Sequence, residues 1–191
     1  MPRTQADRTA TTRAALQDAA IDILVERGWA AVSAVEVCNR AGVSRGAFHH
    51  HYANLPQLLA DALRRLYEKA LPSDPPTITN VAELVDATWA AMSNTQFKAV
   101  LEAWLAMAND PSLRDEIGPV VAAFPNVVRA DHLAPNVLAT DDDRAFYLMA
   151  RETLLGLALG RATNGGEPLG HEAVVLAQLR SSVQLPGSPT G

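Results

Sequence analysis

The sequence of 191 residues predicts an all-α protein of about nine helices. Apolar residues recur at intervals of three and four positions over long stretches, as they do on one face of an α-helix. Aliphatic residues and alanine are plentiful and aromatic residues form only 5% of the chain, a composition that suits helices better than strands. Residues that favour helix N-termini precede several of the periodic stretches.

The N-terminal part is expected to be an arm followed by a long helix. Residues 1–8 are predicted to form a disordered arm, as chain termini commonly do. The helix is expected to begin at Thr9 or Thr11 and to run to about Arg27, because apolar residues line its inner face at helical spacing. Gly28 is expected to end it.

Residues 33–54 contain two short helical patterns separated by a tight turn. Ser33 is an expected N-cap, and Glu36, three residues later, is expected to complete a capping box. Gly42 is expected to end the first helix, because glycine readily adopts the positive φ found at helix C-termini. Ser44 is the expected cap of the second. Two short helices joined by a glycine-containing turn form a helix-turn-helix, whose second helix enters the major groove of DNA.

Many residues of this stretch match one known family in register. They are Ala19-Ala20, Leu24, Gly28-Trp29, Ala41-Gly42-Val43-Ser44, Gly46, Phe48, His51, Tyr52 and Asn54. Through them the chain resembles the tetracycline-repressor (TetR) family of bacterial transcription regulators over roughly residues 9–71. The resemblance implies an N-terminal three-helix DNA-binding domain and a C-terminal helical domain that binds an effector and forms a homodimer. Most members are repressors that bind a palindromic operator.

The resemblance implies that both motif helices contact an operator. Ser33 and Ser44 would place hydroxyls and helix N-terminal N–H groups beside phosphates. Arg45 is the candidate for reading guanine, and the small Gly46 and Ala47 would let the helix approach the base edges. The expected DNA-binding residues are Ser33, Val35, Ser44, Arg45, Gly46, Ala47, His49, His50 and Tyr52.

Three positions of the motif need separate comment. Phe48 and Tyr52, four residues apart, are expected on the buried face of the second helix, although Tyr52 also belongs to the DNA-binding set. His49 stands where the family usually has a phosphate-contacting tyrosine. Leu55 stands where a phosphate-binding lysine is common, so one backbone contact is expected to be missing.

The chain is predicted to have four segments. Residues 1–54 form the arm and the helix-turn-helix domain, and residues 55–76 form a connecting helix, capped by Asn54, and a proline-rich linker. Residues 77–185 form the helical effector-binding and dimerisation domain, and residues 186–191 form a disordered tail.

Several helices are expected in the third segment. Asn80 with Glu83 predicts a second capping box, and Pro119 and Pro125 are expected to divide or kink the helix that starts at Pro111. Three other helices are expected. They cover residues 96–109, residues 141–163, and residues 167–183. The second follows a Thr140 cap, has Asp141-Asp142-Asp143 in its first turn and ends at Asn164-Gly165-Gly166.

Large adaptable side chains in the third segment predict an effector pocket, although simple core packing would explain them as well. Few charges fall in these helices, which favours a mainly apolar effector with one polar anchor. The expected ligand-binding residues are Trp89, Met92, Phe97, Leu101, Trp104, Phe124, Tyr147 and Arg151.

The helix expected at residues 145–160 is apolar nearly all round, so it needs a partner on more than one side. Gly156 and Gly160, four residues apart, would let a neighbouring helix approach closely. Together with the last helix, it resembles the pair through which family members form a four-helix dimer interface. We therefore expect a homodimer through the last two helices.

The distribution of charge and the cysteine content bear on which half faces DNA and on where the protein is located. Residues 1–71 carry nine Lys or Arg against seven Asp or Glu, whereas residues 72–191 carry seven against fourteen. The positive half is thus the half with the helix-turn-helix, as a DNA-facing domain requires. The single cysteine, Cys38, is interpreted as a buried apolar residue in a reducing cytoplasm rather than as a redox sensor. No stretch is predicted to be a signal peptide or to span a membrane.

Other classes of function find little support in the residues. Three consecutive histidines, His49 to His51, point about 100° apart on a helix and cannot converge on one metal ion. The acidic run at residues 141–143 is explained by capping. No catalytic motif stands out, so neither an enzyme nor a cofactor or metal site is expected. The alternative function is a helical ligand-binding or enzymatic protein without sequence-specific DNA binding.

Overall fold

A computed structural model describes residues 5–70, 76–122 and 132–182. These residues form nine α-helices and one short 3₁₀ helix, which confirms the all-α prediction. The helices are α1 (Gln5–Arg27), η1 (Trp29–Ala31), α2 (Ala34–Ala41), α3 (Arg45–His51), α4 (Leu55–Ala70), α5 (Val81–Met92), α6 (Phe97–Met107), α7 (Pro111–Ala122), α8 (Asp141–Thr163) and α9 (Glu172–Ser182). None of these helices is both long and apolar enough to cross a membrane.

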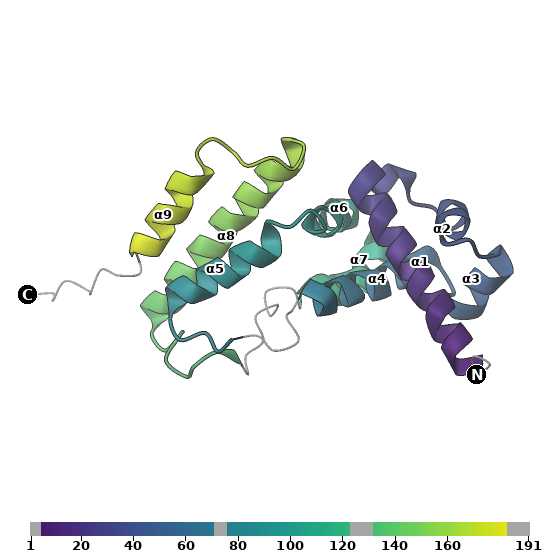
Figure 1. The fold of residues 1–191 in the computed structure, drawn as a ribbon, viewed down its shortest axis with the longest axis horizontal. Coiled ribbons are helices and arrows are strands. Elements are labelled where there is room, and N and C mark those ends of the chain that lie inside the picture. The colour runs from purple at the N-terminus through teal and green to yellow at the C-terminus, as the bar shows by residue number, and fades with distance from the viewer. Residues whose placement is uncertain (1–4, 71–75, 123–131, 183–191) are drawn as a thin grey trace, which may run out of the picture. The chain divides into compact units, whose positions relative to one another are not determined.

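The helices group into two compact units (Figure 1). The first unit holds α1 to α4 together with α6 and α7, and the second holds α5, α8 and α9. This grouping by contacts divides the helices of the predicted effector-binding segment between both units. It describes packing rather than function, so the functional boundaries stay a prediction.

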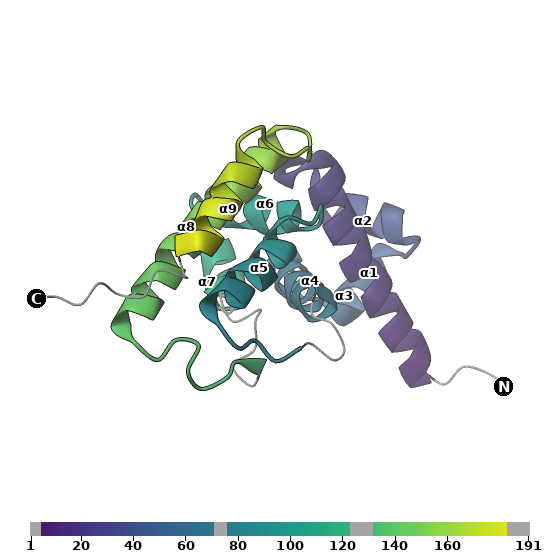
Figure 2. The ribbon, with the colours of Figure 1, turned by 60° about the vertical axis from the view of Figure 1, so that its left-hand side comes forward.

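In the first unit, α1 packs against both α2 and α4, and α4 also packs against α7. Figures 1 and 2 show α2 and α3 beside the purple helix α1. Large apolar side chains fill the space between these helices, because each helix turns one stripe inward. The fully buried ones are Leu16, Ile23, Leu24, Phe48, Leu58, Leu59, Leu63, Leu113 and Ile117, and the ring of Tyr52 is buried with them.

In the second unit, α5 runs beside α8 in both views (Figures 1 and 2). Leu84, Val85 and Leu154 are fully buried there. Arg161 of α8 joins all three helices of this unit. It donates to both carboxylate oxygens of Glu172 in α9 at 2.6 and 2.5 Å, and to the Ser93 carbonyl after α5 at 3.3 Å.

Two helix ends differ from the prediction. Helix α1 begins at Gln5, so the predicted arm is helical from there, with Asp7 in the first turn favouring the helix dipole. Helix α9 begins at Glu172 rather than near Glu167, because Pro168 and Gly170 intervene and both disfavour helix.

The predicted interruption at Pro119 does not divide the helix. Pro119 lies inside helix α7, so the helix does not end there, and the expectation of a kink or of a second short helix beyond it stays a prediction. Pro125, which was expected to act in the same way, lies outside the described residues. Asp110 caps α7 as its side chain accepts a hydrogen bond from the Leu113 N–H at 3.1 Å.

The capping boxes form only in part. Ser33 accepts from the Glu36 N–H at 3.2 Å, but the Glu36 carboxylate pairs with Arg27 instead of returning to the cap. Asn80 caps α5, while the Glu83 carboxylate accepts from the N–H of Thr79 at 2.6 Å, one residue before the cap. A complete box forms at the start of α8, where Thr140 and Asp143 each accept from the other's backbone.

Candidate nucleic-acid interface

The turn between α2 and α3 is built by local hydrogen bonds. Gly42 ends α2 with φ 67°, a left-handed conformation that glycine adopts without steric cost. The Val43 N–H then donates to the Cys38 carbonyl at 3.0 Å, which closes the turn. Ser44 Oγ accepts from the Ala47 N–H at 3.1 Å and so caps α3. These bonds confirm the helix-turn-helix that the residue pattern predicts.

Most of the expected DNA-binding residues share one accessible surface on α2 and α3. Seven of them are exposed, and Ala47 is half-buried. We call these eight residues the motif surface: Ser33, Val35, Ser44, Arg45, Gly46, Ala47, His49 and His50. Hydroxyls, one guanidinium, two imidazoles and two helix N-termini meet there, and these are groups that contact phosphates and base edges.

The two arginines of the motif helices differ in their partners. Arg40 pairs with Glu26 at 2.5 Å and lies 3.6 Å from a carboxylate oxygen of Asp22. Arg45 makes no ion pair with any described residue, and its side chain is exposed. A guanidinium in that situation is available for bidentate contact with a guanine or a phosphate.

Gly46 leaves open space on the motif surface. A Cβ built on Gly46 would meet Ser44 Oγ at 3.8 Å, an ordinary van der Waals distance. The fold of this chain therefore does not require glycine at position 46. Its small size is instead suited to close approach of another molecule to the start of α3.

Buried side chains of α2 and α3 lie beneath the motif surface. Val37 and Cys38 of α2 and Phe48 of α3 are buried. Burial raises the pKa of the Cys38 thiol, although the nearby Arg45 charge opposes the shift. The neutral thiol is therefore the favoured form, and it behaves as a small apolar group.

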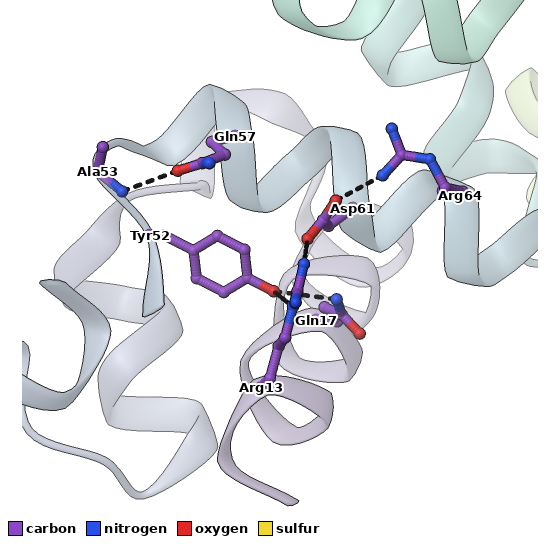
Figure 3. Close-up of polar contacts among 7 residues, drawn as sticks. All are labelled: Arg13, Gln17, Tyr52, Ala53, Gln57, Asp61 and Arg64. Carbon is purple, nitrogen blue, oxygen red and sulfur yellow. Dashed lines mark hydrogen bonds and ion pairs between the residues drawn. The ribbon is translucent and has the colours of Figure 1, made fainter. Parts of the chain in front are cut away.

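Tyr52 does not belong to the motif surface, because only 2% of it is exposed. Its hydroxyl accepts hydrogen bonds from Gln17 and Arg13 of α1 (Figure 3). Burial raises the pKa of Tyr52, and these two hydrogen bonds offset part of that effect. This burial disagrees with the expectation that Tyr52 contacts DNA directly. The expectation that Tyr52 lies on the buried face of α3 is confirmed.

The three histidines at the end of α3 lie in different surroundings. His49 and His50 are exposed, whereas His51 is half-buried. Burial lowers the pKa of His51, and the neighbouring His50 and Arg13 charges lower it further. Among the described residues, no three His, Cys, Asp or Glu side chains are grouped so that they could hold a metal ion.

Comparison with known proteins identifies the family. The family model described as bacterial regulatory proteins, tetR family, matches residues 16–62. The chain is also 30% identical over 167 residues to the HTH-type transcriptional regulator CymR of Pseudomonas putida, covering 82% of each protein. This chain belongs to the TetR family. It is a DNA-binding transcriptional regulator, and the motif surface is its candidate operator-binding surface.

Other TetR-family relatives and solved structures agree with this assignment. The HTH-type transcriptional regulator BetI of Rhizobium meliloti is 28% identical over 127 residues, or 63% of this chain and 62% of that protein. A transcriptional regulator from Rhodococcus sp. Rha1 has the same fold, with a TM-score of 0.68 at 24% identity over 90% of this chain and 95% of that one. The multidrug binding protein EbrR, solved with ethidium, gives a TM-score of 0.63 at 26% identity over 91% and 99%.

The expected ligand-binding residues are divided between the two units. Trp89, Met92, Phe97 and Tyr147 are buried in the second unit, where Arg151 is half-buried and pairs with Glu152 at 2.6 Å. Leu101 and Trp104 lie in the first unit, and Phe124 lies outside the described residues. The expected ligand-binding set therefore falls partly in each unit, and its assignment to an effector site stays a prediction.

Two of the buried polar contacts in this TetR-family protein bear on the expected ligand set. The Tyr147 hydroxyl lies 3.0 Å from Thr88 Oγ1, and the Arg161 guanidinium lies 5.1 Å from the centre of the Trp89 ring. Both aromatic side chains are thus engaged by neighbours in the second unit. Core packing accounts for these contacts as well as a pocket would.

Sequence analysis missed several residues that support the DNA-binding helices. Glu102 of α6 accepts from the Trp29 N–H at 2.8 Å, and Lys98 of the same helix donates to the Val25 carbonyl at 2.8 Å. Arg13 and Gln17 donate to the Tyr52 hydroxyl, and Asp61 accepts from Arg13. The sequence pattern around these residues is weak, because each is a single polar residue beside an apolar stripe. The partner of each lies dozens of positions away in the chain.

Proposed function

We propose that this TetR-family regulator is a homodimeric repressor that binds a palindromic operator and releases it when a small, mainly apolar effector binds. The observation that supports operator binding most directly is the motif surface, with Arg45 exposed and without an ion pair among the described residues. In this proposal each subunit places α3 in a major groove, with Ser33 and Ser44 beside phosphates.

Selection of bound fragments from randomised DNA tests operator binding. We expect a palindromic sequence whose affinity falls steeply as the salt concentration rises, because cationic contacts to phosphates release counterions. A folded protein that enriches no sequence at low salt would favour the alternative, a helical ligand-binding or enzymatic protein without sequence-specific DNA binding. The proposal includes no catalytic activity.

Arg45→Ala tests the reading of bases. We expect a loss of operator binding of about 1–3 kcal/mol, as for removal of a bidentate base contact. Arg40→Ala is the matched control, since it removes the same charge from the same motif but from an arginine paired with Glu26. Equal effects of the two variants would mean that Arg45 contributes only charge.

The proposed dimer uses the exposed apolar side chains of α8 and α9. Leu148, Met149 and Leu159 of α8 and Val174 of α9 are exposed large hydrophobic residues. A Cβ on Gly156 would meet no described atom within 4 Å, whereas one on Gly160 would meet Leu169 of the same chain at 2.5 Å. The predicted close approach of a neighbouring helix is therefore retained in the proposal only at Gly156.

Charge substitution on this apolar surface tests the dimer. Leu148→Glu is expected to shift the protein from dimer to monomer in light scattering and to weaken operator binding, because both half-sites must be held together. Leu105→Glu is the control, since Leu105 is 64% exposed but lies on α6. A monomeric wild-type protein at micromolar concentration would contradict the proposal.

The effector in this proposal is a small, mainly apolar compound. Support comes from the buried Trp89, Met92 and Tyr147 in the second unit and from the similarity to EbrR, which was solved with ethidium. Ethidium is therefore the first probe for release of a labelled operator, followed by a panel of apolar compounds. A cytoplasmic location also stays a prediction.

A further inference from the structure

Helix α3 is too short to hold its own direction. It spans seven residues, Arg45–His51, and an isolated helix of that length is not stable in water. Its orientation therefore depends on side chains that attach it to the rest of the first unit. Phe48 anchors its middle, and Tyr52, the residue at its C-terminal cap, anchors its end.

Two donors from α1 hold the Tyr52 hydroxyl (Figure 3). Gln17 Nε2 donates at 2.9 Å and Arg13 Nε donates at 3.2 Å, which engages both lone pairs of the oxygen. The Arg13 guanidinium also lies 5.6 Å from the centre of the Tyr52 ring. These contacts fix the far end of a buried side chain, and with it the direction in which α3 ends.

Helix α4 in turn holds Arg13. The Nη2 of Arg13 donates to Asp61 Oδ2, and Asp61 Oδ1 accepts from Arg64 at 2.5 Å (Figure 3). A planar guanidinium can serve Tyr52 through Nε and Asp61 through Nη2 at the same time. The connection Tyr52–Arg13–Asp61 therefore joins α3, α1 and α4.

The turn that leads from Tyr52 into α4 is closed by local hydrogen bonds. The Ala53 N–H donates to Gln57 Oε1 at 2.9 Å, and the Gln57 N–H donates to Asn54 Oδ1 at 2.8 Å. Gln57 and Asp61 are four residues apart, so both side chains lie on the same face of α4. These local bonds order the turn directly after Tyr52.

We propose that Arg13 is a positioning residue for operator recognition, which it serves by locking the end of α3 to α1 and α4 through Tyr52 and Asp61. The inference rests on the operator binding proposed above. Arg13 and Asp61 contribute the orientation of the motif surface and make no base contact themselves.

The exposure of Arg13 makes the role of its guanidinium separable from stability, although its partner Tyr52 and the neighbouring Gln17 are buried and the Asp61 side chain is only 15% exposed. Arg13 has a side chain that is 53% exposed, and it borders a polar cleft of about 200 Å³. The cleft is lined by Arg13, Gln17, Asp61, Arg64, Arg65 and Glu68. An ion pair whose arginine is this exposed adds little to folding stability. Loss of the Arg13–Asp61 pair should therefore change DNA recognition more than it changes unfolding, whereas Tyr52→Phe also removes a buried hydrogen bond.

Asp61→Asn and Tyr52→Phe test the inference, with Asp18→Asn as the matched control. Asp18 also bridges α1 to α4, since it accepts from Lys69 at 2.7 Å and from Arg65 at 3.3 Å, but neither bond reaches Tyr52. Asp61→Asn and Asp18→Asn each remove one negative charge, so simple electrostatics predicts tighter DNA binding for both. Tyr52→Phe keeps the buried ring and removes only the hydroxyl.

The measurement is the ratio of affinity for the selected operator to affinity for random DNA at one salt concentration. We expect Asp61→Asn and Tyr52→Phe to lower this ratio on the order of tenfold, within the range of coupling between contacting residues. Asp18→Asn should leave the ratio unchanged. Thermal unfolding of each variant shows whether it folds. If Asp61→Asn does not fold, the ratio measured for Tyr52→Phe decides the question.

A double-mutant cycle provides the second readout. Arg13→Met and Tyr52→Phe should be non-additive in the specificity ratio, because each breaks the same connection. Ratios equal to that of the wild-type protein in the folded variants would overturn the positioning role while leaving operator binding intact. If the wild-type protein itself selects no operator, operator binding fails, and the positioning role fails with it.

Discussion

The two units of this regulator differ in what they leave exposed. The first unit buries most of its large apolar side chains, with Val35 and Leu105 as exceptions, and exposes the largely polar motif surface. The second unit buries a smaller core and leaves Leu148, Met149, Leu159 and Val174 exposed on α8 and α9. The same kind of helix packing thus produces one surface suited to a charged polymer and one suited to another apolar helix pair.

The two units also contain ion pairs that differ in their exposure to solvent. In the first unit, Asp18 pairs with Arg65 and Lys69 at the surface, where nearly half of the Asp18 side chain is exposed. In the second unit, Arg161 pairs with Glu172, whose side chain is only 8% exposed. The Asp18 pairs of the first unit therefore remain close to solvent, whereas the Arg161–Glu172 pair of the second unit is sheltered.

The largest expected effect contrasts a buried with an exposed apolar residue. Phe48→Ala removes the buried anchor of α3 and should lower the free energy of unfolding by about 3–5 kcal/mol. Met149→Ala, at a position 65% exposed, should lower the stability of the isolated subunit by less than about 0.5 kcal/mol but weaken the dimer. Urea denaturation and light scattering measure the two quantities. A large loss of subunit stability in Met149→Ala would mean that α8 is not an exposed surface.

The next contrast compares the two ion pairs. Glu172→Gln should lower unfolding free energy by about 1–3 kcal/mol, because Arg161 loses its sheltered charged partner. Asp18→Asn should cost less than about 1 kcal/mol, because its pair is exposed. Urea denaturation at neutral pH measures both losses, and similar values would contradict the difference drawn between the units.

The pH dependence of the Glu172 effect has a definite sign. The hydrogen bonds from Arg161 hold the pKa of Glu172 below its ordinary value near 4.5, although burial opposes the shift. The stabilisation is therefore fully present above about pH 4.5 and is lost as pH falls through the lower pKa of the folded state. The difference between wild-type protein and Glu172→Gln should shrink in that acid range, and a difference that stays constant would contradict the pairing.

Matched helix caps give a smaller effect. Ser44→Ala and Asn80→Ala each remove a side chain that accepts from a backbone N–H at the start of a helix. Each should cost about 0.5–2 kcal/mol of stability, but only Ser44→Ala should also weaken operator binding. Ser44→Asp should restore the cap while repelling phosphate. Operator binding restored by Ser44→Asp would place Ser44 away from the DNA backbone.

The smallest effects on stability come from two glycines with open surroundings. Gly46→Ala should raise stability by about 0.5–1 kcal/mol, because alanine favours helix over glycine and nothing in the chain obstructs the added methyl group. Gly156→Ala should do the same in α8. We expect Gly46→Ala to lower operator affinity and Gly156→Ala to lower dimer affinity. Exchanged or absent effects, measured by fluorescence anisotropy and light scattering, would contradict the assignment of the two surfaces.

Features that depend on neighbouring residues were predicted well from the sequence. The caps at Ser33, Ser44 and Thr140 and the stop at Gly42 were all correct, because each joins residues a few positions apart. The late start of α9 also has a local cause, because Pro168 and Gly170 precede it. The expected ligand-binding set stays a prediction, since a buried aromatic residue has the same sequence pattern in a core and in a pocket.

The sequence alone therefore determined the helical class, the helix-turn-helix and the residues of the motif surface, since periodicity and capping are local properties. Only the tertiary structure decided how α3 is held, that Tyr52 is an anchor, and that Gly160 is covered by its own chain. Arg13 and Asp61 are 48 positions apart, and Trp29 and Glu102 are 73 apart. Contacts over such distances depend on how helices pack in three dimensions, and no single stretch of sequence specifies that packing.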